Sequence, residues 1–299
     1  MANLKALKIR ISSVKSTQKI TKAMKMVAAS KLRRAQERAE QGRPYSEKMA
    51  ETLALLAAGI DPTNAPAMMV GRRDTEGKLI ENTHLIVVAT ADRGLCGGFN
   101  STIIRAVKQQ IEEAKAQGKK VQLLTVGRKG HEVLKLNYSD LIIDYVNTTE
   151  KRTLDYITAE EISDKVAELF EDRKIDSCSI VFNKFVSALQ QDVHFQPLIP
   201  LTLDNAESKE AETAKASYCY EPESDEILKD LLPRNVAVQI YHALLENSAS
   251  EQGARMTAMD NATRNAGDMI QNLTLQYNRT RQAAITTELT EIISGAEAL

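Results

Sequence analysis

The sequence predicts an α/β protein in which the two chain ends form a long antiparallel α-helical coiled coil around a central Rossmann-like α/β domain. Three observations support this prediction. Residues 234–299 contain no proline and carry apolar or small residues at three- and four-residue spacing. Residues 3–58 show a similar spacing. Between the two, β-branched runs alternate with amphipathic segments, the pattern of a doubly wound sheet.

The composition favours helices and a reducing environment. The 299 residues are 43% hydrophobic but only 4% aromatic, with no tryptophan, which argues against a β-sandwich. Cys96, Cys178 and Cys219 stand far apart without a CxxC pair, so we expect free thiols. No run of eighteen apolar residues predicts a membrane span, and no secretory signal is visible.

The formal net charge of −1 conceals an asymmetry between the chain ends. Residues 1–36 hold ten Lys or Arg and no acid, whereas residues 235–299 hold four Arg, no Lys and seven acids. The two ends are therefore electrostatically complementary. The basic start resembles a mitochondrial presequence in charge, but its apolar spacing continues into the following segment, so we do not expect it to be cleaved.

The amino-terminal helix is predicted over residues 1–60, with Pro44 kinking it without ending it. Gln18, Thr21 and Lys25 interrupt its apolar seam. A second stripe on another face spans that interruption, which suits a helix with different partners along its length. The seam is Leu4, Leu7, Ile11, Val14, Ala28, Leu32, Ala35 and Ala39; the second stripe is Ile20, Met24 and Val27.

The carboxyl-terminal segment, 223–299, is predicted as a short helix from Asp225 to Leu232, then Pro233, then one long helix. About 60 helical residues span roughly 90 Å, far more than a compact middle of the chain with a radius of gyration near ~16 Å. Residues 283–293 carry only two charges, so we expect a partner to enclose them. The seam is Met256, Met259, Thr263, Ala266, Ile270, Leu273, Tyr277, Thr280 and Ala284.

The central domain is predicted over residues 83–222, after a polar linker at 61–82. Strands are expected at 85–90, 121–126, 141–146 and 177–185, with right-handed helical crossovers between them. An antiparallel edge strand at 192–195 and a last strand at 217–222 complete the prediction, with a patternless acidic loop at 204–216.

No catalytic, metal or cofactor site is predicted. The glycine-rich turn 91–100 follows a strand and precedes a helix, but it matches neither dinucleotide nor P-loop spacing, so we interpret it as a docking surface. Cys96 within it has no neighbouring base and is interpreted as a buried small side chain. The four histidines lie on separate elements without metal-ligand spacing.

The basic amino terminus leaves three interpretations open. It could bind nucleic acid phosphates, it could bind acidic loops of a protein partner, or it could pair in part with the acidic carboxyl-terminal helix. No aromatic residue lies between Met1 and Pro44, so base stacking has no candidate there.

Three stretches together resemble one family. They are KITKAMKMVAASK at 19–31, DRGLCGG at 92–98, and a carboxyl-terminal block comprising SEQGARMTAMDNA at 250–262 and NRTRQAAITTELTEIISGAEA at 278–298. The sequence resembles the γ subunits of F-type ATP synthases along its whole length. The family's closing pattern is met by Ile285, Thr286, Glu288, Glu291, Gly295 and Ala296.

The resemblance implies a rotor. Such subunits form a coiled-coil shaft inside a ring of catalytic and non-catalytic subunits, with an α/β foot domain near a membrane ring that protons turn. The catalytic sites then belong to the ring, and this chain has no active site of its own. Implied partners are the α and β subunits, a small ε-type stalk subunit (called δ in mitochondria) and the membrane c-ring, with one copy of this chain per complex and no nucleic acid.

The resemblance also assigns residues. Contacts with the α/β ring are implied for Lys19, Lys22, Met24, Lys25, Arg255, Arg281, Gln282, Thr286, Glu288 and Glu291. The tip in an apolar bearing is implied for Ile285, Leu289, Ile292 and Ile293. Contact of the foot with the small stalk subunit and the c-ring is implied for Arg93, Gly94, Leu95, Cys96, Gly97, Gly98, Tyr218 and Tyr220.

The loop 204–216 lacks the inserted cysteine pair of plastid relatives, so thiol regulation is not expected. The resemblance favours a peripheral position on the cytoplasmic face of a bacterial inner membrane, with the matrix side of a mitochondrial inner membrane as the alternative. The competing functional hypothesis is a non-enzymatic coiled-coil adaptor whose basic helix binds nucleic acid.

Overall fold

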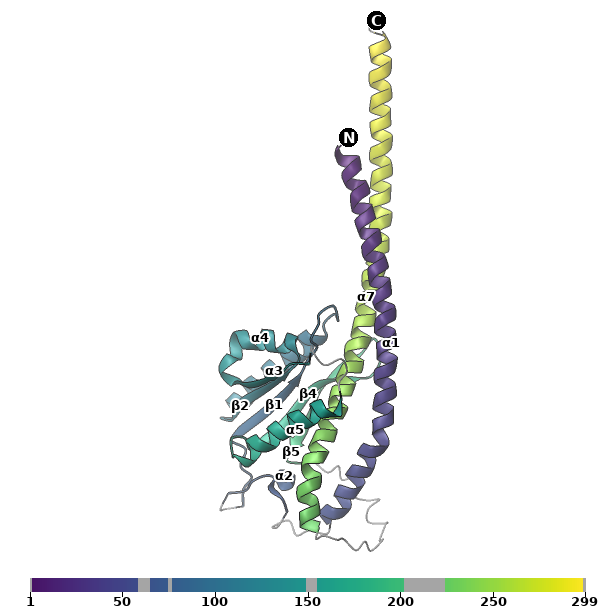
Figure 1. The fold of residues 1–299 in the computed structure, drawn as a ribbon. Helices are drawn as coiled ribbons and strands as arrows, with labels where there is room; N and C mark the ends of the chain where they lie inside the picture. Colours follow the sequence, from purple (N-terminus) through teal and green to yellow (C-terminus); the bar gives the residue numbers. More distant parts are fainter. Residues whose placement is uncertain (1, 59–64, 75–76, 149–154, 202–223, 298–299) are drawn as a thin grey trace. The chain divides into compact units, whose positions relative to one another are not determined.

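The computed structural model describes residues 2–58, 65–74, 77–148, 155–201 and 224–297. The chain forms two compact units, one of Met1–Ser30 with Arg255–Leu299 and one of Lys31–Ala254. We call them the helix-pair unit and the sheet unit. Two long helices, α1 (Ala2–Ala58) and α7 (Ser224–Glu297), each contribute residues to both units (Figure 1).

The sheet unit contains a five-stranded mixed sheet of order β3-β2-β1-β4-β5. The strands are β1 (Thr83–Ala89), β2 (Lys120–Val126), β3 (Ile142–Val146), β4 (Ser177–Phe185) and β5 (Gln191–Ile199). The first four are parallel and β5 is antiparallel to β4, which confirms the predicted doubly wound domain. β5 is longer than the predicted edge strand and includes Pro197, which an edge strand tolerates because one side needs no ladder bond.

Helices cover both faces of the sheet, and the alternation of side chains along β1 decides which. Ile86 and Val88 pack with α3 (Phe99–Ala116) and α4 (Arg128–Tyr138). Leu85 and Val87 pack with α5 (Tyr156–Glu171) and α7. A short helix, α2 (Ala67–Val70), and a 3-10 turn, η1 (Ser139–Leu141), complete the unit. The period of two in a fully buried strand therefore builds two separate apolar cores.

α7 is one helix, so the predicted break at Pro233 is wrong. Proline removes one backbone bond and crowds the preceding turn, a cost of about 3 kcal/mol in a helix interior. Packing on both sides of the proline offsets that cost. Leu228 and Leu232 pack against Leu53 and its neighbours on α1, and Val236 packs into the core of the sheet. α1 likewise continues through Pro44, as predicted.

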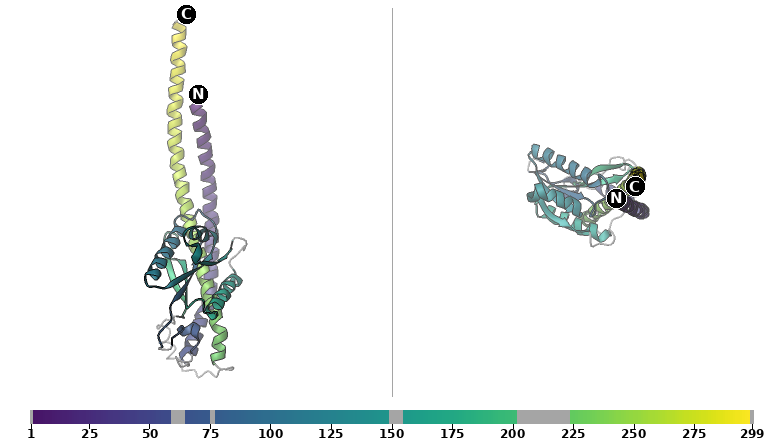
Figure 2. Two further views of the ribbon diagram at one scale, coloured as in Figure 1. Left: turned by 90° about the vertical axis from the view of Figure 1, so that its left-hand side faces the viewer. Right: turned by 90° about the horizontal axis from the view of Figure 1, so that it is seen from above.

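In the helix-pair unit, α1 and α7 run antiparallel and lie side by side in both views of Figure 2. The predicted seam on α7 is confirmed, because Met259, Ala266 and Leu273 are buried while most of their neighbours on the outer face are exposed. On α1, Leu7 and Ala28 are buried in the same way. The predicted strand at 217–222 and the loop at 204–216 lie outside the described residues.

Candidate partner-contact surfaces

The seam of the helix pair is interrupted by a polar layer at the place where the sequence predicted one. The hydroxyls of Thr21 and Thr263 lie 2.8 Å apart and hydrogen-bond each other, and Thr21 is buried. Gln18 donates from Nε2 to the backbone carbonyl of Thr263 at 3.4 Å. A Cβ added to Gly267 would lie 3.2 Å from that Nε2, so the glycine leaves room for the amide. The layer also fixes the antiparallel register.

Lys25 extends this layer with an ion pair inside the chain. Its Nζ lies 2.5 Å from Oδ1 of Asp260, and Arg264 binds the other carboxylate oxygen. The Lys25 hydrogen bond is the main cause that lowers the pKa of Asp260 below its ordinary value. Of the three interpretations of the basic segment, pairing with the carboxyl-terminal helix therefore holds for Lys25.

The other predicted ring contacts on this part of α1 are Lys19, Lys22 and Met24, and their surroundings differ from those of Lys25. Lys19 and Lys22 are exposed, and in the described residues neither takes part in an ion pair. Met24 is half-buried, while Ile20 and Val27 on the same predicted stripe are exposed. The helix pair thus presents a narrow apolar stripe flanked by free ammonium groups. This surface is available to an apolar partner with acidic neighbours.

The end of α7 carries the other predicted contacts. Thr21 faces Thr263 in the antiparallel helix pair, so Ala2, the first residue of α1, lies opposite Gln282 in the same register. Beyond that point α7 has no α1 residue opposite it. Its apolar residues Ile285, Leu289, Ile292 and Ile293 are exposed, Ile292 at 68%. The predicted polar contacts Arg281, Gln282, Thr286, Glu288 and Glu291 are also exposed, while Arg255 is half-buried.

The glycine-rich turn lies at the carboxyl end of β1. Leu95 and Gly97 adopt positive φ angles of 65° and 60°, and Leu95 is 64% exposed. Cys96 points inward and is buried, with Asn100 Nδ2 donating to its sulfur at 3.4 Å. The interpretation of Cys96 as a buried side chain is confirmed. Arg93, Gly94 and Gly98 are exposed, whereas Tyr218 and Tyr220 lie outside the described residues.

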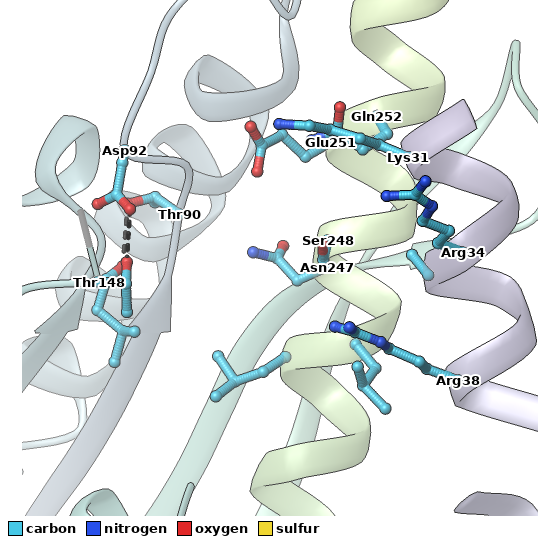
Figure 3. Close-up of a pocket in the computed structure, with 14 residues that line it drawn as sticks. Lys31, Arg34, Arg38, Thr90, Asp92, Thr148, Asn247, Ser248, Glu251 and Gln252 are labelled. Carbon is cyan, nitrogen blue, oxygen red and sulfur yellow. Dashed lines mark hydrogen bonds between the residues drawn. The ribbon is translucent and has the colours of Figure 1, made fainter. Parts of the chain in front are cut away.

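Sequence reasoning missed a polar cavity in the sheet unit (Figure 3). Its volume is about 270 Å³, and it lies between α1, α7 and the carboxyl ends of β1 and β2. Three cations, Lys31, Arg34 and Arg38, line it from one face of α1. Their spacing of three and four residues was a visible signal, but nothing in the sequence placed Asn247, Gln252 or Asp92 opposite them.

One glycine shapes the far wall of this cavity. Gly127 has φ of +91°, and a Cβ added there would lie 2.1 Å from the carbonyl oxygen of Thr90. Only glycine therefore lets the turn after β2 approach the end of β1. The hydroxyl of Thr90, in turn, accepts a hydrogen bond from the backbone N–H of Gly130 at 2.9 Å.

Three histidines, His84, His131 and His242, have pKa values below the ordinary value of the imidazole. The ring nitrogens of His84 lie 2.7 and 2.8 Å from the hydroxyls of Ser177 and Ser179. Burial lowers the pKa of His84 to about 4, and the pKa values of His131 and His242 are also lowered, chiefly by burial. Within the described residues, no three His, Cys, Asp or Glu side chains come together as metal ligands, and no helix is apolar enough to cross a membrane.

Comparison with known proteins gives a full-length match. A family model described as ATP synthase matches residues 3–299. The chain is 52% identical to an ATP synthase gamma chain from Pelagibacter ubique over 300 residues, covering 100% of both chains. It is 54% identical to an ATP synthase gamma chain from Sinorhizobium fredii, again over 100% of both chains.

Solved structures agree. A chain in the central stalk and c-ring of the Tetrahymena thermophila mitochondrial ATP synthase has a TM-score of 0.60 at 31% identity, covering 81% of this chain and 99% of that one. A chain in the Euglena gracilis mitochondrial ATP synthase has a TM-score of 0.68 at 20% identity, covering 99% and 94%. At that identity the Euglena match speaks for the fold alone.

Proposed function

Because the chain belongs to the family of ATP synthase gamma chains, we propose how its surfaces work against the other subunits of such an enzyme. The chain is the rotor of the central stalk of an F-type ATP synthase. It is not an enzyme by itself, since the catalytic sites of the complex lie on the alpha and beta subunits. Its task is mechanical, and the relevant chemistry is that of surfaces.

The ring of α and β subunits encloses the helix-pair unit. The observation that supports this most directly is the end of α7, where four large apolar side chains stand exposed on a helix with no α1 residue opposite. An apolar collar would remove that surface from water without needing ordered hydrogen bonds, so the helix can turn within it. Leu289 and Ile292 are the residues we assign to this bearing, with Ile285 and Ile293 beside them.

Acidic loops of the catalytic subunits contact the amino-terminal half of the helix pair. Lys19 and Lys22 supply unpaired charge there, and Met24 supplies an apolar contact between them. Lys25 is available to both partners, because its ammonium already bonds Asp260 while its side chain as a whole is still 43% exposed. On α7, Arg255 lies near the start of the same region, while Arg281, Gln282, Thr286, Glu288 and Glu291 surround the bearing.

The turn at 92–98 docks the small stalk subunit and links the rotor to the c-ring. Its support is the exposed Leu95 held in a positive-φ conformation by a turn whose interior is filled by Cys96. A cysteine replacing Leu95 would test this by cross-linking in the assembled enzyme. Cross-linking to the ε-type subunit is expected. Cross-linking only to β would instead show that the turn contacts the ring of α and β subunits.

The complex holds one copy of this chain and lies on the cytoplasmic face of a bacterial inner membrane, to which the chain is attached through its partners. Bacterial relatives at 52% and 54% identity support this location. The nucleic-acid adaptor hypothesis loses its support, because a match over residues 3–299 accounts for the basic helix within a rotor.

The test is reconstitution with separately purified α and β subunits. We expect a complex containing one copy of this chain with six partners, and ATPase activity that depends on it. Leu289→Lys should impair that activity, whereas Leu136→Lys on α4, an exposed apolar residue of the sheet unit that is not one of the proposed ring contacts, should not. Absence of any complex, or equal effects of the two variants, would contradict the proposed enclosure.

A further inference from the structure

The polar cavity of the sheet unit lies outside the carboxyl ends of β1 and β2, where Val126 ends β2. These two strands are parallel neighbours inside the sheet. In open α/β sheets the crevice outside the carboxyl ends of such strands is the usual place for a ligand. Thr90 and Asp92, which directly follow β1, line the cavity here.

One wall of the cavity is cationic. Lys31, Arg34 and Arg38 project from the same face of α1, because residues three and four apart lie one above the other on a helix. In the part of the chain that the structure describes, none of the three forms an ion pair. Arg33, by contrast, does not line the cavity, and its Nε lies 2.9 Å from Oε1 of Glu37. The charges of Lys31, Arg34 and Arg38 are therefore available to a ligand in the cavity.

The second wall, from α7, is built of amides. Gln252 is only 8% exposed and lines the cavity, yet no described residue hydrogen-bonds its side chain. Asn247 is also buried, and its Oδ1 already accepts the backbone N–H of Asn183 at 3.1 Å. Its amide nitrogen is drawn towards the cavity in Figure 3. The free polar atoms of these two amides are not among the fully buried side-chain atoms that lack a partner, so they can hydrogen-bond water or a ligand in the cavity.

The third wall, after β1, carries the carboxylate of Asp92, whose two oxygens already accept hydrogen bonds. Asp92 accepts the hydroxyl of Thr148 at 2.7 Å through one oxygen and the backbone N–H of Arg128 at 3.0 Å through the other. Glu251 lies on the α7 wall, and its side chain also has an interaction partner. The cavity thus offers three unpaired cations and two amides to a ligand, which together make hydrogen-bond donors towards an anion.

We propose that this cavity binds a phosphate group, held by Lys31, Arg34 and Arg38 on one side and by Asn247 and Gln252 on the other. A volume of about 270 Å³ suits orthophosphate or the phosphate end of a nucleotide. Planar guanidinium groups match phosphate oxygens with two bonds each, and side-chain amides complete the shell. The site goes beyond the rotor function and requires no partner subunit.

Isothermal titration of the full chain with sodium orthophosphate, in phosphate-free buffer at low salt, tests the proposal. We expect saturable binding of one phosphate per chain with a Kd of about 1 mM or tighter. Arg34→Gln should weaken binding at least about tenfold, since it removes a charge-assisted hydrogen bond. Arg33→Gln makes the same change of charge one residue away, outside the cavity, and should leave the Kd within about twofold.

Gln252→Leu is the second variant, because it leaves the net charge unchanged. A specific site predicts that it weakens phosphate binding at least about tenfold. Circular dichroism identical to that of the parent chain shows that each variant is folded. No saturable heat with the parent chain, equal losses in Arg33→Gln and Arg34→Gln, or unaltered binding in Gln252→Leu would each overturn the proposal.

Titration with ADP distinguishes the two sources of phosphate. Binding of ADP at least tenfold tighter than orthophosphate, and lost in Arg34→Gln, identifies a nucleotide as the ligand. Equal or weaker binding of ADP identifies free phosphate. In either case, acetate at the same concentration should not compete, because a single carboxylate cannot engage both arginines and the amide wall.

Discussion

The helix-pair unit and the sheet unit differ in how much of their large apolar side chains they bury. In the sheet unit the strands β1 and β4 are buried on both faces by large aliphatic side chains such as Ile86 and Ile180. In the helix-pair unit the buried seam mixes a few large residues such as Leu273 with small ones and the threonine pair, Thr21 and Thr263, while other large apolar residues are exposed. One unit buries most of its large apolar side chains by folding, and the other leaves several of them exposed.

From this difference we expect the sheet unit to supply most of the stability of the chain and the helix pair to supply its function. Core residues in the sheet unit are expected to determine the free energy of unfolding and to have little effect on rotation within the complex. Exposed residues at the end of α7 are expected to behave in the opposite way. Substitutions in the core of the sheet unit should therefore change the free energy of unfolding more than substitutions in the helix-pair unit.

Ile180→Ala should give the largest effect. Ile180 is 0% exposed in the core between β4, α5 and α7, so the change leaves a cavity and costs about 2–5 kcal/mol of unfolding free energy. Leu289→Ala removes a similar volume from an exposed site and should change the free energy by less than about 0.5 kcal/mol. Urea unfolding of the free chain measures both. Comparable losses in the two variants would contradict the division.

The second effect comes from pH and resides in the sheet unit. The pKa of His84 is lowered from 6.5 to about 4 because burial and, to a lesser degree, Lys119 disfavour its charged form. The unfolded chain therefore binds more protons between these pH values, and stability falls as pH drops from about 6.5 towards 4. The contribution of His84 over this range is about 3 kcal/mol.

His84→Gln removes this titration and retains hydrogen-bonding groups for Ser177 and Ser179. The measurement is the urea midpoint at pH 7 and at pH 4.5 for both chains. A smaller loss of stability in the variant is expected, with His131 and His242 titrating equally in each. The same loss in both chains would show that His84 is not the group responsible.

The polar layer of the helix pair should contribute little. Thr21→Val removes one hydroxyl of a pair, but Thr263 still donates to the carbonyl of Met259 at 2.7 Å, so the cost should stay within about 1 kcal/mol. Replacing both threonines with valine should recover that loss, since an apolar pair of the same shape needs no partner. Hydrogen exchange of the amides around Thr263 measures it. A double variant that loses more stability than the two single variants together would contradict this account.

Asp260 gives the smallest and most local effect. Its pKa is lowered in the folded chain, mainly by the hydrogen bond from Lys25, so its stabilising contribution is present at neutral pH and is lost as pH falls below the ordinary range of a carboxyl. Asp260→Asn should abolish this dependence near Lys25 and leave the sheet unit unchanged. Hydrogen exchange measured separately for the two units is the test, and a change confined to the sheet unit would refute it.

Much of this fold follows from local pattern. The sequence correctly predicted the seam positions on both helices, the four parallel strands and the polar interruption at Gln18, Thr21 and Lys25. Each of these features depends on the spacing of residues within a single helix or strand. Pro233 was misjudged, since local propensity predicts a break and only the packing of Leu232 and Val236 maintains the helix.

The site was predictable to a lesser degree. The candidate partner-contact surface at the end of α7 could be predicted because residues 283–293 carry few charges. The unpaired Lys19 could be predicted because the amino-terminal segment has many cations and no acid. The polar cavity was not predictable, because Arg34, Asp92 and Gln252 come from three distant segments that meet only at the carboxyl edge of the sheet. The intrachain bond of Lys25 was likewise one of several open alternatives until the helix register was known.

Labelling of a single cysteine at position 289 tests the central claim most directly. In a Cys219→Ser background, with the buried Cys96 and Cys178 retained, a thiol placed by Leu289→Cys should react rapidly in the free chain, where position 289 is exposed. After assembly with α and β subunits, the account predicts that it becomes strongly protected, while a cysteine replacing Leu136 on α4 keeps its reactivity. Equal reactivity at position 289 before and after assembly would contradict the enclosure of the helix pair by the ring.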